Sequence, residues 1–332
     1  MQDARYDLVG IGNAIVDIIG RCDDAFLSKH DLDKGRMHLI DAKQADRLYA
    51  AMGPGTERSG GSAANTIAGF ASFGGRGAFI GRVADDQFGK VFAHDIRAIG
   101  VGYDTPPAKS GLPTALCLIF VTPDGERTMN TFLGASTELG TGEIDAKLIA
   151  AANVTYLEGY LFDKPEAKQA FRAAAEIASK AGRKTALTLS DAFCVDRHRD
   201  DFRHLVQNDV DILFANETEI TALFQVNSFE EAVTAVRGAC NVAVLTRSAD
   251  GSTIVTADET VTVKPEPVAK VSDVTGAGDL YAAGFLYGLT RGLPLAACGK
   301  LGSIAAAEVI SHIGARPETS LAELARKQGI AV

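Results

Sequence analysis

Short apolar runs that alternate with helical patterns are the feature that most constrains the fold of this 332-residue chain. Runs of this kind are typical of strands in a parallel sheet that helices cover on both faces. The expected strands are residues 7–11, 78–80, 154–157, 185–189, 211–214 and 242–245, and the clearest helices are residues 63–73, 88–99 and 165–181. The alternation predicts a single α/β domain over residues 1–332, with a doubly wound, mostly parallel sheet.

Two segments interrupt this alternation. Residues 14–45 lack a clear helical period, and residues 108–135 contain the apolar runs 115–121 and 127–132 on either side of a Pro-Asp-Gly turn. The second segment is therefore expected to form a β-hairpin. Together the two segments are predicted to pair into a small β-sheet that lies as a lid over the carboxyl ends of the main strands, where open α/β sheets bind ligands.

Composition excludes several classes of function. A formal net charge of −9 disfavours nucleic acid as a partner, because phosphate backbones attract a surplus of Lys and Arg. No apolar run approaches the roughly 18 residues of a membrane-spanning helix, and the first residues lack a basic, apolar leader, so a cytoplasmic protein is expected. The five cysteines are far apart and favour buried thiols over a disulfide framework or a zinc site.

The stretch DVTGAGD places a carboxylate just after a glycine turn. Gly276, Ala277 and Gly278 lack bulky side chains and precede a helix expected to begin near Asp279, where unpaired N–H groups attract anions. An aspartate that only capped the helix would need no Gly-x-Gly before it. The pattern indicates phosphoryl transfer to a hydroxyl: the N–H groups would hold the moving phosphoryl group, and Asp279 would accept the hydroxyl proton.

DVTGAGD resembles the carboxy-terminal signature of the ribokinase-like (PfkB-type) carbohydrate kinases, and the resemblance extends over nearly the whole chain. It implies a ribokinase-like fold with a β-sheet lid, ATP as the phosphoryl donor and Mg²⁺ as a cofactor. In GIGNAIVDI, Asn13 and Asp17 match family residues that bind sugar hydroxyls. In SGGSAAN, Gly61 matches a residue that lets substrate lie against the backbone, and Asn65 matches a residue that binds hydroxyls.

Two further motifs imply a nucleotide site. FANETEI matches the family's Asn-x-x-Glu pattern at Asn216 and Glu219, which would face a hydrated Mg²⁺ and the ATP phosphates. An ordinary helix cap with a surface Glu is the alternative for this motif alone. TRSADG matches Thr-x-Gly-x-x-Gly at Thr246 and Gly251, but Ser248 stands where the family has its first glycine. The absence of a GxxxxGK[ST] motif excludes a P-loop kinase.

Within the family, the sequence is most similar to the adenosine kinases. LSDAF carries Phe193, which matches an aromatic residue facing the purine, and FLGAS carries Leu133 and Ala135, which match apolar contacts of the base pocket. Arg127 matches a lid arginine that approaches the phosphates. A nucleoside needs a flat apolar slot with an aromatic side chain to stack on. Sugar kinases of the ribokinase or fructokinase type would share many of these residues and stay alternatives, as do guanosine and inosine kinases.

The resemblance therefore implies transfer of the γ-phosphoryl group of ATP to the 5′-hydroxyl of a nucleoside, with adenosine converted to AMP in purine salvage. Some relatives use K⁺ near the loop that contains Asp273 and Thr275, and the sequence leaves K⁺ open here. It also leaves open whether the protein is a monomer or a homodimer. A non-catalytic nucleoside-binding protein is a distant alternative. A dinucleotide-binding dehydrogenase is disfavoured because Ile15 replaces the third glycine of that fingerprint.

Overall fold

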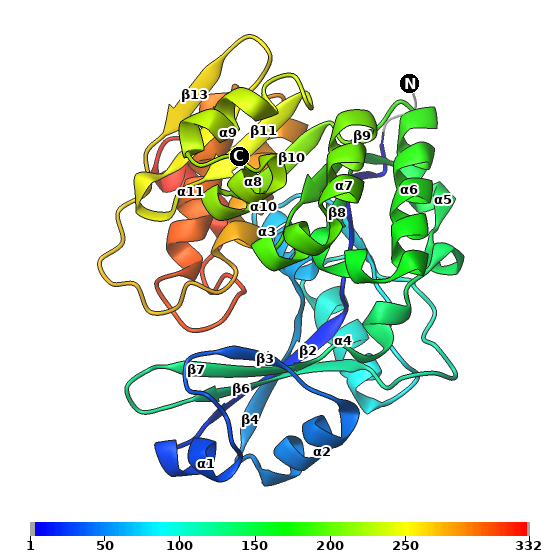
Figure 1. Ribbon diagram of the computed structural model, residues 1–332, viewed down its shortest axis with the longest axis vertical. Helices are drawn as coiled ribbons and strands as arrows, with labels where there is room; N and C mark the ends of the chain where they lie inside the picture. Colours follow the sequence, from blue (N-terminus) through cyan, green and yellow to red (C-terminus); the bar gives the residue numbers. More distant parts are fainter. Residues whose placement is uncertain (1–3, 331–332) are drawn as a thin grey trace.

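The computed structural model describes residues 4–330, which form two sheets (Figure 1). The chain first crosses from one sheet to the other between β1 (Tyr6–Ile11) and β2 (Ile15–Arg21). The larger sheet has eight strands in the order β13-β12-β11-β10-β9-β8-β1-β5, and the smaller has five in the order β3-β7-β6-β2-β4. In Figure 1 the smaller sheet lies below the larger one. We call the smaller sheet, with helices α1 and α2, the lid.

The larger sheet is parallel from β5 to β11, and β12 and β13 add an antiparallel edge. This arrangement confirms the predicted doubly wound, mostly parallel sheet. Its strands are β1 (Tyr6–Ile11), β5 (Gly77–Ile80), β8 (Ala152–Glu158), β9 (Lys184–Thr188), β10 (Ile212–Asn216), β11 (Val242–Thr246), β12 (Ser252–Val255) and β13 (Thr260–Val263).

Helices cover both faces of this sheet. Leu213 and Ala215 of β10 pack in one hydrophobic core and Phe214 packs in another, because successive strand side chains point to opposite faces. The core that contains Phe214 is completed by α3 (Ser62–Ser72), α10 (Ala277–Thr290) and α11 (Leu295–Val309). The other is completed by α5 (Ala146–Ala150), α6 (Pro165–Lys180), α7 (Ala192–Asn208), α8 (Glu217–Phe224) and α9 (Phe229–Val236).

The remaining helices lie at the periphery. They are α4 (Gln87–Ala98), which packs against β4 of the lid, and α12 (Leu321–Lys327), which packs against α11. Short 3-10 turns occupy Gly134–Glu138, Thr141–Glu143, Gly159–Asp163 and Ser248–Asp250. Within residues 4–330, no helix combines the length and apolar character needed to cross a membrane.

The lid contains the expected hairpin, formed by β6 (Ala115–Val121) and β7 (Arg127–Phe132). Its other strands are β2 (Ile15–Arg21), β3 (Met37–Leu39) and β4 (Gly55–Gly60), and its helices are α1 (Asp24–Lys29) and α2 (Ala42–Ala51). Strand β4 lies outside the ranges 14–45 and 108–135 from which the lid was predicted, so the lid is larger than expected. Its sequence GTERSG shows no apolar alternation, and the pairing with β2 makes it a strand.

The two faces of the lid differ. Helices α1 and α2 lie on the side away from the larger sheet (Figure 1), where Leu27 and Leu48 join the core that contains Val16 and Ile18. The opposite face carries the alternate residues of β2, among them Asp17. It also carries a small apolar cluster of Ile15, Ile19, Cys117, Ile119, Val121 and Met129. This face is the one directed toward the edge of the larger sheet where the candidate site residues gather.

Candidate active site

Helix α10 begins at the glycine turn. Gly276 is its N-cap residue, in the left-handed region at φ 80° and ψ 0°, and a Cβ there would lie 2.8 Å from the Cβ of Ala315. Both the conformation and the space therefore require glycine. Within the described chain no side chain caps this helix. The Ala277 N–H donates to the Val274 carbonyl oxygen at 3.2 Å, so the N–H groups of Gly278 and Asp279 are the ones left to bind an anion. Asp279 lies in the first turn and is not the cap.

Asp279 is half-buried and is held by helix α3. Its carboxylate accepts hydrogen bonds from Ser62 Oγ at 2.6 Å and from Asn65 Nδ2 at 3.3 Å. Burial raises the pKa of Asp279 to about 6, although these hydrogen bonds and the charge of Arg316 act in the opposite direction. A carboxylate with such a pKa is charged at neutral pH and can still take up a proton, as a general base must.

Glu158 fixes the start of helix α3 at the carboxyl end of β8. Its buried carboxylate accepts from the Ala63 N–H at 2.8 Å and from Asn13 Nδ2 at 2.6 Å. Gly61 is the N-cap of α3 at φ 100°, and a Cβ there would lie 2.1 Å from the carbonyl oxygen of Asn13. Burial raises the pKa of Glu158 to about 7. Sequence reasoning missed Glu158, although an acid that directly follows a buried strand is a usable signal.

Asn13 joins β1 to the lid. Its Nδ2 donates to Glu158, and its Oδ1 accepts from Ser136 Oγ at 2.7 Å, so both ends of the buried amide have protein partners. Ser136 belongs to the same 3-10 turn as Ala135 and follows Leu133, which brings the FLGAS segment next to Asn13. Hydroxyl binding by Asn13 stays a prediction; the observed contacts give its side chain a structural role.

Asp17 of the lid lies within electrostatic reach of Asp279. Burial raises the pKa of Asp17 to about 6; the charges of Arg316 and Arg127 oppose this rise, and the charge of Asp279 adds to it. The charge of Asp279 thus reaches Asp17, and such an effect falls off with separation. The structure therefore brings the predicted hydroxyl-binding residue and the predicted base to one site, although they are far apart in the sequence.

Arg127 connects the lid to the loop before the glycine turn. Its Nη1 is paired with the Asp273 carboxylate and donates to Thr275 Oγ1 at 3.0 Å, and both members of the ion pair are buried. Asp273 also accepts from the N–H groups of Thr275 at 3.0 Å and Gly314 at 2.9 Å. The two residues considered for K⁺ thus face a guanidinium. Arg127 lies beside the turn at which the phosphates were expected.

Two residues predicted to bind the nucleotide lie at the ends of neighbouring strands. They are Asn216 of β10 and Thr246 of β11, which are paired in register. Asn216 caps α8: its Oδ1 accepts from the Glu219 N–H at 2.9 Å, and its Nδ2 donates to Glu219 Oε1 at 2.7 Å. The other carboxylate oxygen accepts from the Asn216 N–H at 2.9 Å. Asn216 and Glu219 thus form a capping box, as in the alternative of an ordinary helix cap. Glu219 is not on the surface, however: it is buried, and burial raises its pKa to about 7.

The side-chain oxygen atoms of Asn216 and Glu219 could bind Mg²⁺ only through its coordinated water molecules. Both carboxylate oxygens of Glu219 are already hydrogen-bonded, and among residues 4–330 no cluster of three His, Cys, Asp or Glu side chains is placed to hold a metal directly. Mg²⁺ keeps several waters and relies on substrate phosphates in phosphoryl-transfer sites. The residues present therefore fit a hydrated ion, which Asn216 and Glu219 would hold through its waters.

Two residues depart from the family pattern or from the predicted role: Ser248, in a 3-10 turn, and Phe193, in helix α7. Ser248 adopts φ 48°, the left-handed region that a glycine would favour, and Gly251 closes the same turn at φ 82°. The turn thus keeps a glycine-type backbone without the glycine. Phe193, predicted to face a purine, lies in the first turn of α7 with its side chain 75% exposed. Stacking on Phe193 stays a prediction.

Arg316, which precedes α12, was not predicted at all. Its Nε donates to Asn65 Oδ1 at 2.8 Å, and its Nη2 donates to Ser59 Oγ at 3.1 Å. Burial lowers the pKa of Arg316 to about 10, against the opposing charges of the carboxylates. The carboxylates concerned are Asp95, Asp17 and Asp279. No spacing pattern marks a single arginine in a loop, so only the fold identifies it.

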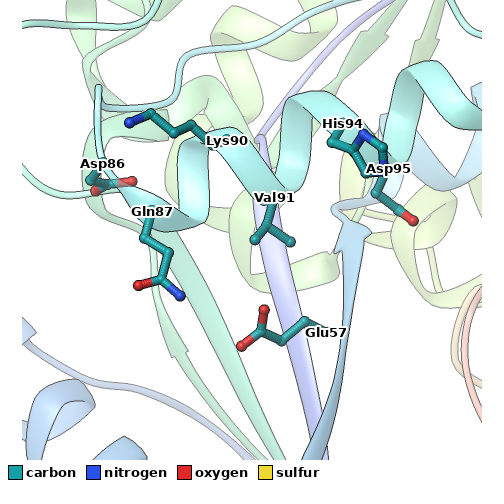
Figure 2. A pocket seen from close by; sticks show the side chains of 7 residues that line it. All are labelled: Glu57, Asp86, Gln87, Lys90, Val91, His94 and Asp95. Carbon is teal, nitrogen blue, oxygen red and sulfur yellow. The ribbon is translucent and has the colours of Figure 1, made fainter.

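A groove of about 640 Å³ lies between helix α4 and strand β4 (Figure 2). Its lining residues are Glu57, Asp86, Gln87, Lys90, Val91, His94 and Asp95, and the predicted site residues are not among them. Asp95 accepts from the Ser59 N–H at 2.7 Å and from Ser59 Oγ at 2.5 Å. The groove is therefore connected to the site through the contacts of Asp95 with Ser59 and of Ser59 with Arg316.

Comparison with known proteins identifies the family. The model of the pfkB family carbohydrate kinases matches residues 37–321, which is most of the chain. The chain belongs to the pfkB family of carbohydrate kinases. It is a phosphotransferase with an alcohol group as acceptor, and this family membership implies the use of ATP, generally with Mg²⁺. The acceptor class is a sugar or a nucleoside.

Three similar proteins place this pfkB kinase among its relatives. A probable sugar kinase from Rhizobium etli CFN 42 is 51% identical, with a TM-score of 0.91, 99% of this chain covered and 100% of the other. The adenosine kinase from Sinorhizobium meliloti is 53% identical, with a TM-score of 0.90, 98% of this chain covered and 100% of the other. The adenosine kinase of Saccharomyces cerevisiae is 26% identical over 92% of this chain and 95% of its own.

Proposed function

We propose that this pfkB kinase is an adenosine kinase, which transfers the γ-phosphoryl group of ATP to the 5′-hydroxyl of adenosine. The observation that carries the choice of acceptor is the 53% identity, over 98% of the chain, to the adenosine kinase of Sinorhizobium meliloti. Two features of the site, its charge and the apolar face of the lid, agree with a neutral nucleoside.

Asp279 is the general base of the proposed reaction. The 5′-hydroxyl loses its proton to the Asp279 carboxylate while its oxygen forms a bond to the γ-phosphorus. The bond from that phosphorus to the β–γ bridging oxygen breaks, and ADP leaves. The hydrogen bonds from Ser62 and Asn65 orient the carboxylate. The N–H groups of Gly278 and Asp279, in the first turn of α10, stabilise the charge on the phosphoryl oxygens.

The charge of the site favours a neutral acceptor. The charge of Asp279 acts on Asp17, and the charges of both and of Asp95 act on Arg316. Arg58 and Arg127 also act on these groups, but the arginines still do not outnumber the carboxylates. A sugar phosphate or a sugar acid would therefore find no surplus of positive charge here. Asp17 can accept hydrogen bonds from ribose hydroxyls, because a carboxylate offers several acceptor positions.

The lid face beside Asp17 supplies apolar surface for a base. Ile15 and Ile19 flank Asp17 on the same face of β2, and Met129 extends that surface on β7. A free sugar would leave this surface unused, whereas a purine would bury it, at roughly 25 cal/mol per Å². This apolar surface beside a polar pocket supports a nucleoside over a small sugar.

The residues that would bind ATP are assigned from their positions in the fold. Asn216 and Thr246 end adjacent strands, and Arg127 lies beside the glycine turn, so the phosphates of ATP would run between them. Bound Mg²⁺ would neutralise phosphate charge. Asn216 and Glu219 would hold its water shell, and Gly251 would let the backbone approach the nucleotide.

A sugar kinase is the second candidate, because the probable sugar kinase from Rhizobium etli is 51% identical to this chain. Guanosine and inosine are further acceptors with the same ribose. A non-catalytic nucleoside-binding protein is disfavoured because a binding protein does not need a hydrogen-bonded base such as Asp279 beside an anion-binding turn.

The test is ADP release from ATP and Mg²⁺ with a panel of acceptors: adenosine, guanosine, inosine, ribose, fructose and fructose phosphates. We expect release with adenosine at the highest kcat/KM. Release with free sugars alone would overturn the choice of a nucleoside. Binding of adenosine without release of ADP would favour the binding protein.

A further inference from the structure

A chain of hydrogen bonds links Arg316 to the base. Arg316 Nε donates to Asn65 Oδ1 at 2.8 Å, and Asn65 Nδ2 donates to Asp279 at 3.3 Å. On the other side, Arg316 Nη2 donates to Ser59 Oγ at 3.1 Å, and that hydroxyl donates to Asp95 at 2.5 Å. The guanidinium is therefore held at one end by Ser59 and at the other contacts the amide that touches Asp279.

The chemistry of these groups permits one orientation of the Asn65 amide. A guanidinium can only donate hydrogen bonds and an ionised carboxylate can only accept them. The amide oxygen of Asn65 must therefore face Arg316, and its NH₂ group must face Asp279. Without the guanidinium, the amide could turn and present its oxygen to the carboxylate, which would repel it.

Arg316 also supplies positive charge to a site rich in carboxylates. The groups that interact electrostatically with Asp279 come from several elements. These are helices α3 and α8, strands β2 and β8, the 3-10 turn after β8, and the loop before α12. The groups are Ser62, Asn65, Arg316, Asp17, Tyr156, Glu158, Tyr160 and Glu219. Arg316 is the cation of this set. It opposes the rise in the pKa of Asp279 that burial causes.

We propose that Arg316 is the positioning residue of this active site: its guanidinium orients the Asn65 amide toward Asp279 and keeps the Asp279 side chain charged and ready to accept a proton. This inference rests on the proposed function for its meaning, since Asp279 is the base only if the protein is a kinase. Its physical content, the effect of Arg316 on Asp279, can be measured without turnover.

The experiment is an NMR titration of the Asp279 carboxyl carbon in protein labelled with ¹³C at the aspartate carboxyl groups, with the signal assigned by its loss in Asp279→Asn. Arg316→Met removes the charge and the donors but keeps an unbranched side chain. Arg58→Met is the matched control. Arg58 is half-buried and precedes Ser59 in the chain, and the charge of Arg58 also acts on Arg316.

We expect Arg316→Met to raise the pKa of Asp279 by about 1 unit, as the loss of a nearby opposite charge does, and Arg58→Met to change it much less. The acid limb of the kcat/KM profile should move to higher pH by the same amount. An unchanged pKa in Arg316→Met would overturn the inference, and so would an equal rise in Arg58→Met. A raised KM for the acceptor with no shift in titration would make Arg316 a substrate contact instead.

Arg316→Lys is the second variant, in case Arg316→Met does not fold. Lysine keeps the charge but cannot bond Asn65 and Ser59 together as a planar guanidinium does. We expect a smaller rise in the pKa than in Arg316→Met, with a kcat lowered by about 10-fold. A kcat and a titration equal to wild type would refute the orienting role. Failure of the wild type to release ADP with any acceptor would overturn the proposed function, while the titration would still decide the role of Arg316.

Discussion

At the scale of single residues, the environment of Asp279 explains how a common side chain becomes a base. Surrounding protein raises its pKa to about 6, and the hydrogen bonds from Ser62 and Asn65 limit the rise. The carboxylate is therefore charged at neutral pH, yet it binds a proton more readily than an exposed aspartate does.

The first prediction concerns pH. The base works in its ionised form, so we expect kcat/KM to fall about tenfold per unit as the pH drops below about 6, the pKa of Asp279. Asp17 titrates in the same range, so the limb reports the coupled pair. The measurement is ADP release between pH 4.5 and 8 under saturating ATP. A kcat/KM that stays level down to pH 4.5, as for an exposed aspartate with a pKa of 3.8, would contradict this environment.

Ser248 gives a prediction about stability. Its φ of 48° costs a residue with a Cβ about 1 kcal/mol, which glycine does not pay. Ser248→Gly should therefore raise the free energy of unfolding, by up to about 1 kcal/mol. Ala249→Gly, in the same turn but without a positive φ, should lower it. Urea unfolding of both variants is the test, and a loss of stability in Ser248→Gly would contradict the argument.

At the scale of elements, the contact between lid strand β7 and the loop before α10 joins the two sheets. The buried pair of Arg127 and Asp273 carries this contact, and Thr275 adds a hydrogen bond. A buried pair that loses one partner leaves an uncompensated charge, which is costly. The position of the lid over the glycine turn therefore depends on Arg127.

Arg127→Met should lower the free energy of unfolding by about 3 kcal/mol, and it should raise the KM for ATP more than the KM for adenosine. Arg21→Met, which changes an exposed arginine of the lid, is the control and should do neither. Thermal unfolding and initial rates at varied ATP would measure both effects. Wild-type stability in Arg127→Met would show that the pair does not hold the lid.

The elements found from the sequence are those whose signal is local. The β6–β7 hairpin and the start of α10 each depend on contiguous residues. The hairpin lies where the pattern predicted it, and α10 begins at Ala277, two residues before the expected Asp279. Strand β4 was missed because its glycines and charged residues become a strand only by pairing with β2. Glu158 and Arg316 were missed for the same kind of reason: their partners Ala63 and Asn65 are far away in the sequence.

At the scale of the whole molecule, Asp7 of β1 ties the first strand to two distant segments. Its buried carboxylate pairs with Arg76 before β5 and with Arg291 after α10. The pKa of Asp7 falls to about 2 because the hydrogen bonds and charges of these arginines outweigh burial, which alone would raise it. Strand β1, which leads to the site at its other end, is therefore held in place by ion pairs of Asp7 with Arg76 and Arg291.

This pKa predicts a pH-dependent part of the stability. A carboxylate whose pKa is depressed in the folded state stabilises the protein above its unfolded pKa of 3.8, and the effect is lost as the pH falls toward about 2. Asp7→Asn should therefore cost about 2 kcal/mol at pH 7 and much less at pH 2. Asp104→Asn, at an exposed ion pair, should cost less than about 1 kcal/mol. A cost for Asp7→Asn that is independent of pH would contradict this assignment.

The measurement that tests the central claim most directly is the kcat of Asp279→Asn with ATP, Mg²⁺ and adenosine, compared with its unfolding midpoint at pH 8. We predict a kcat lower by about 10²–10⁴, with no loss of stability. Stability should not fall because the pKa of Asp279 in the folded protein, about 6, lies above the ordinary value of 3.8. The charged carboxylate therefore destabilises the folded state as the pH rises through about 6, and asparagine removes that charge. A variant that kept wild-type turnover but unfolded more easily would contradict the account, because Asp279 would then support the helix rather than the reaction.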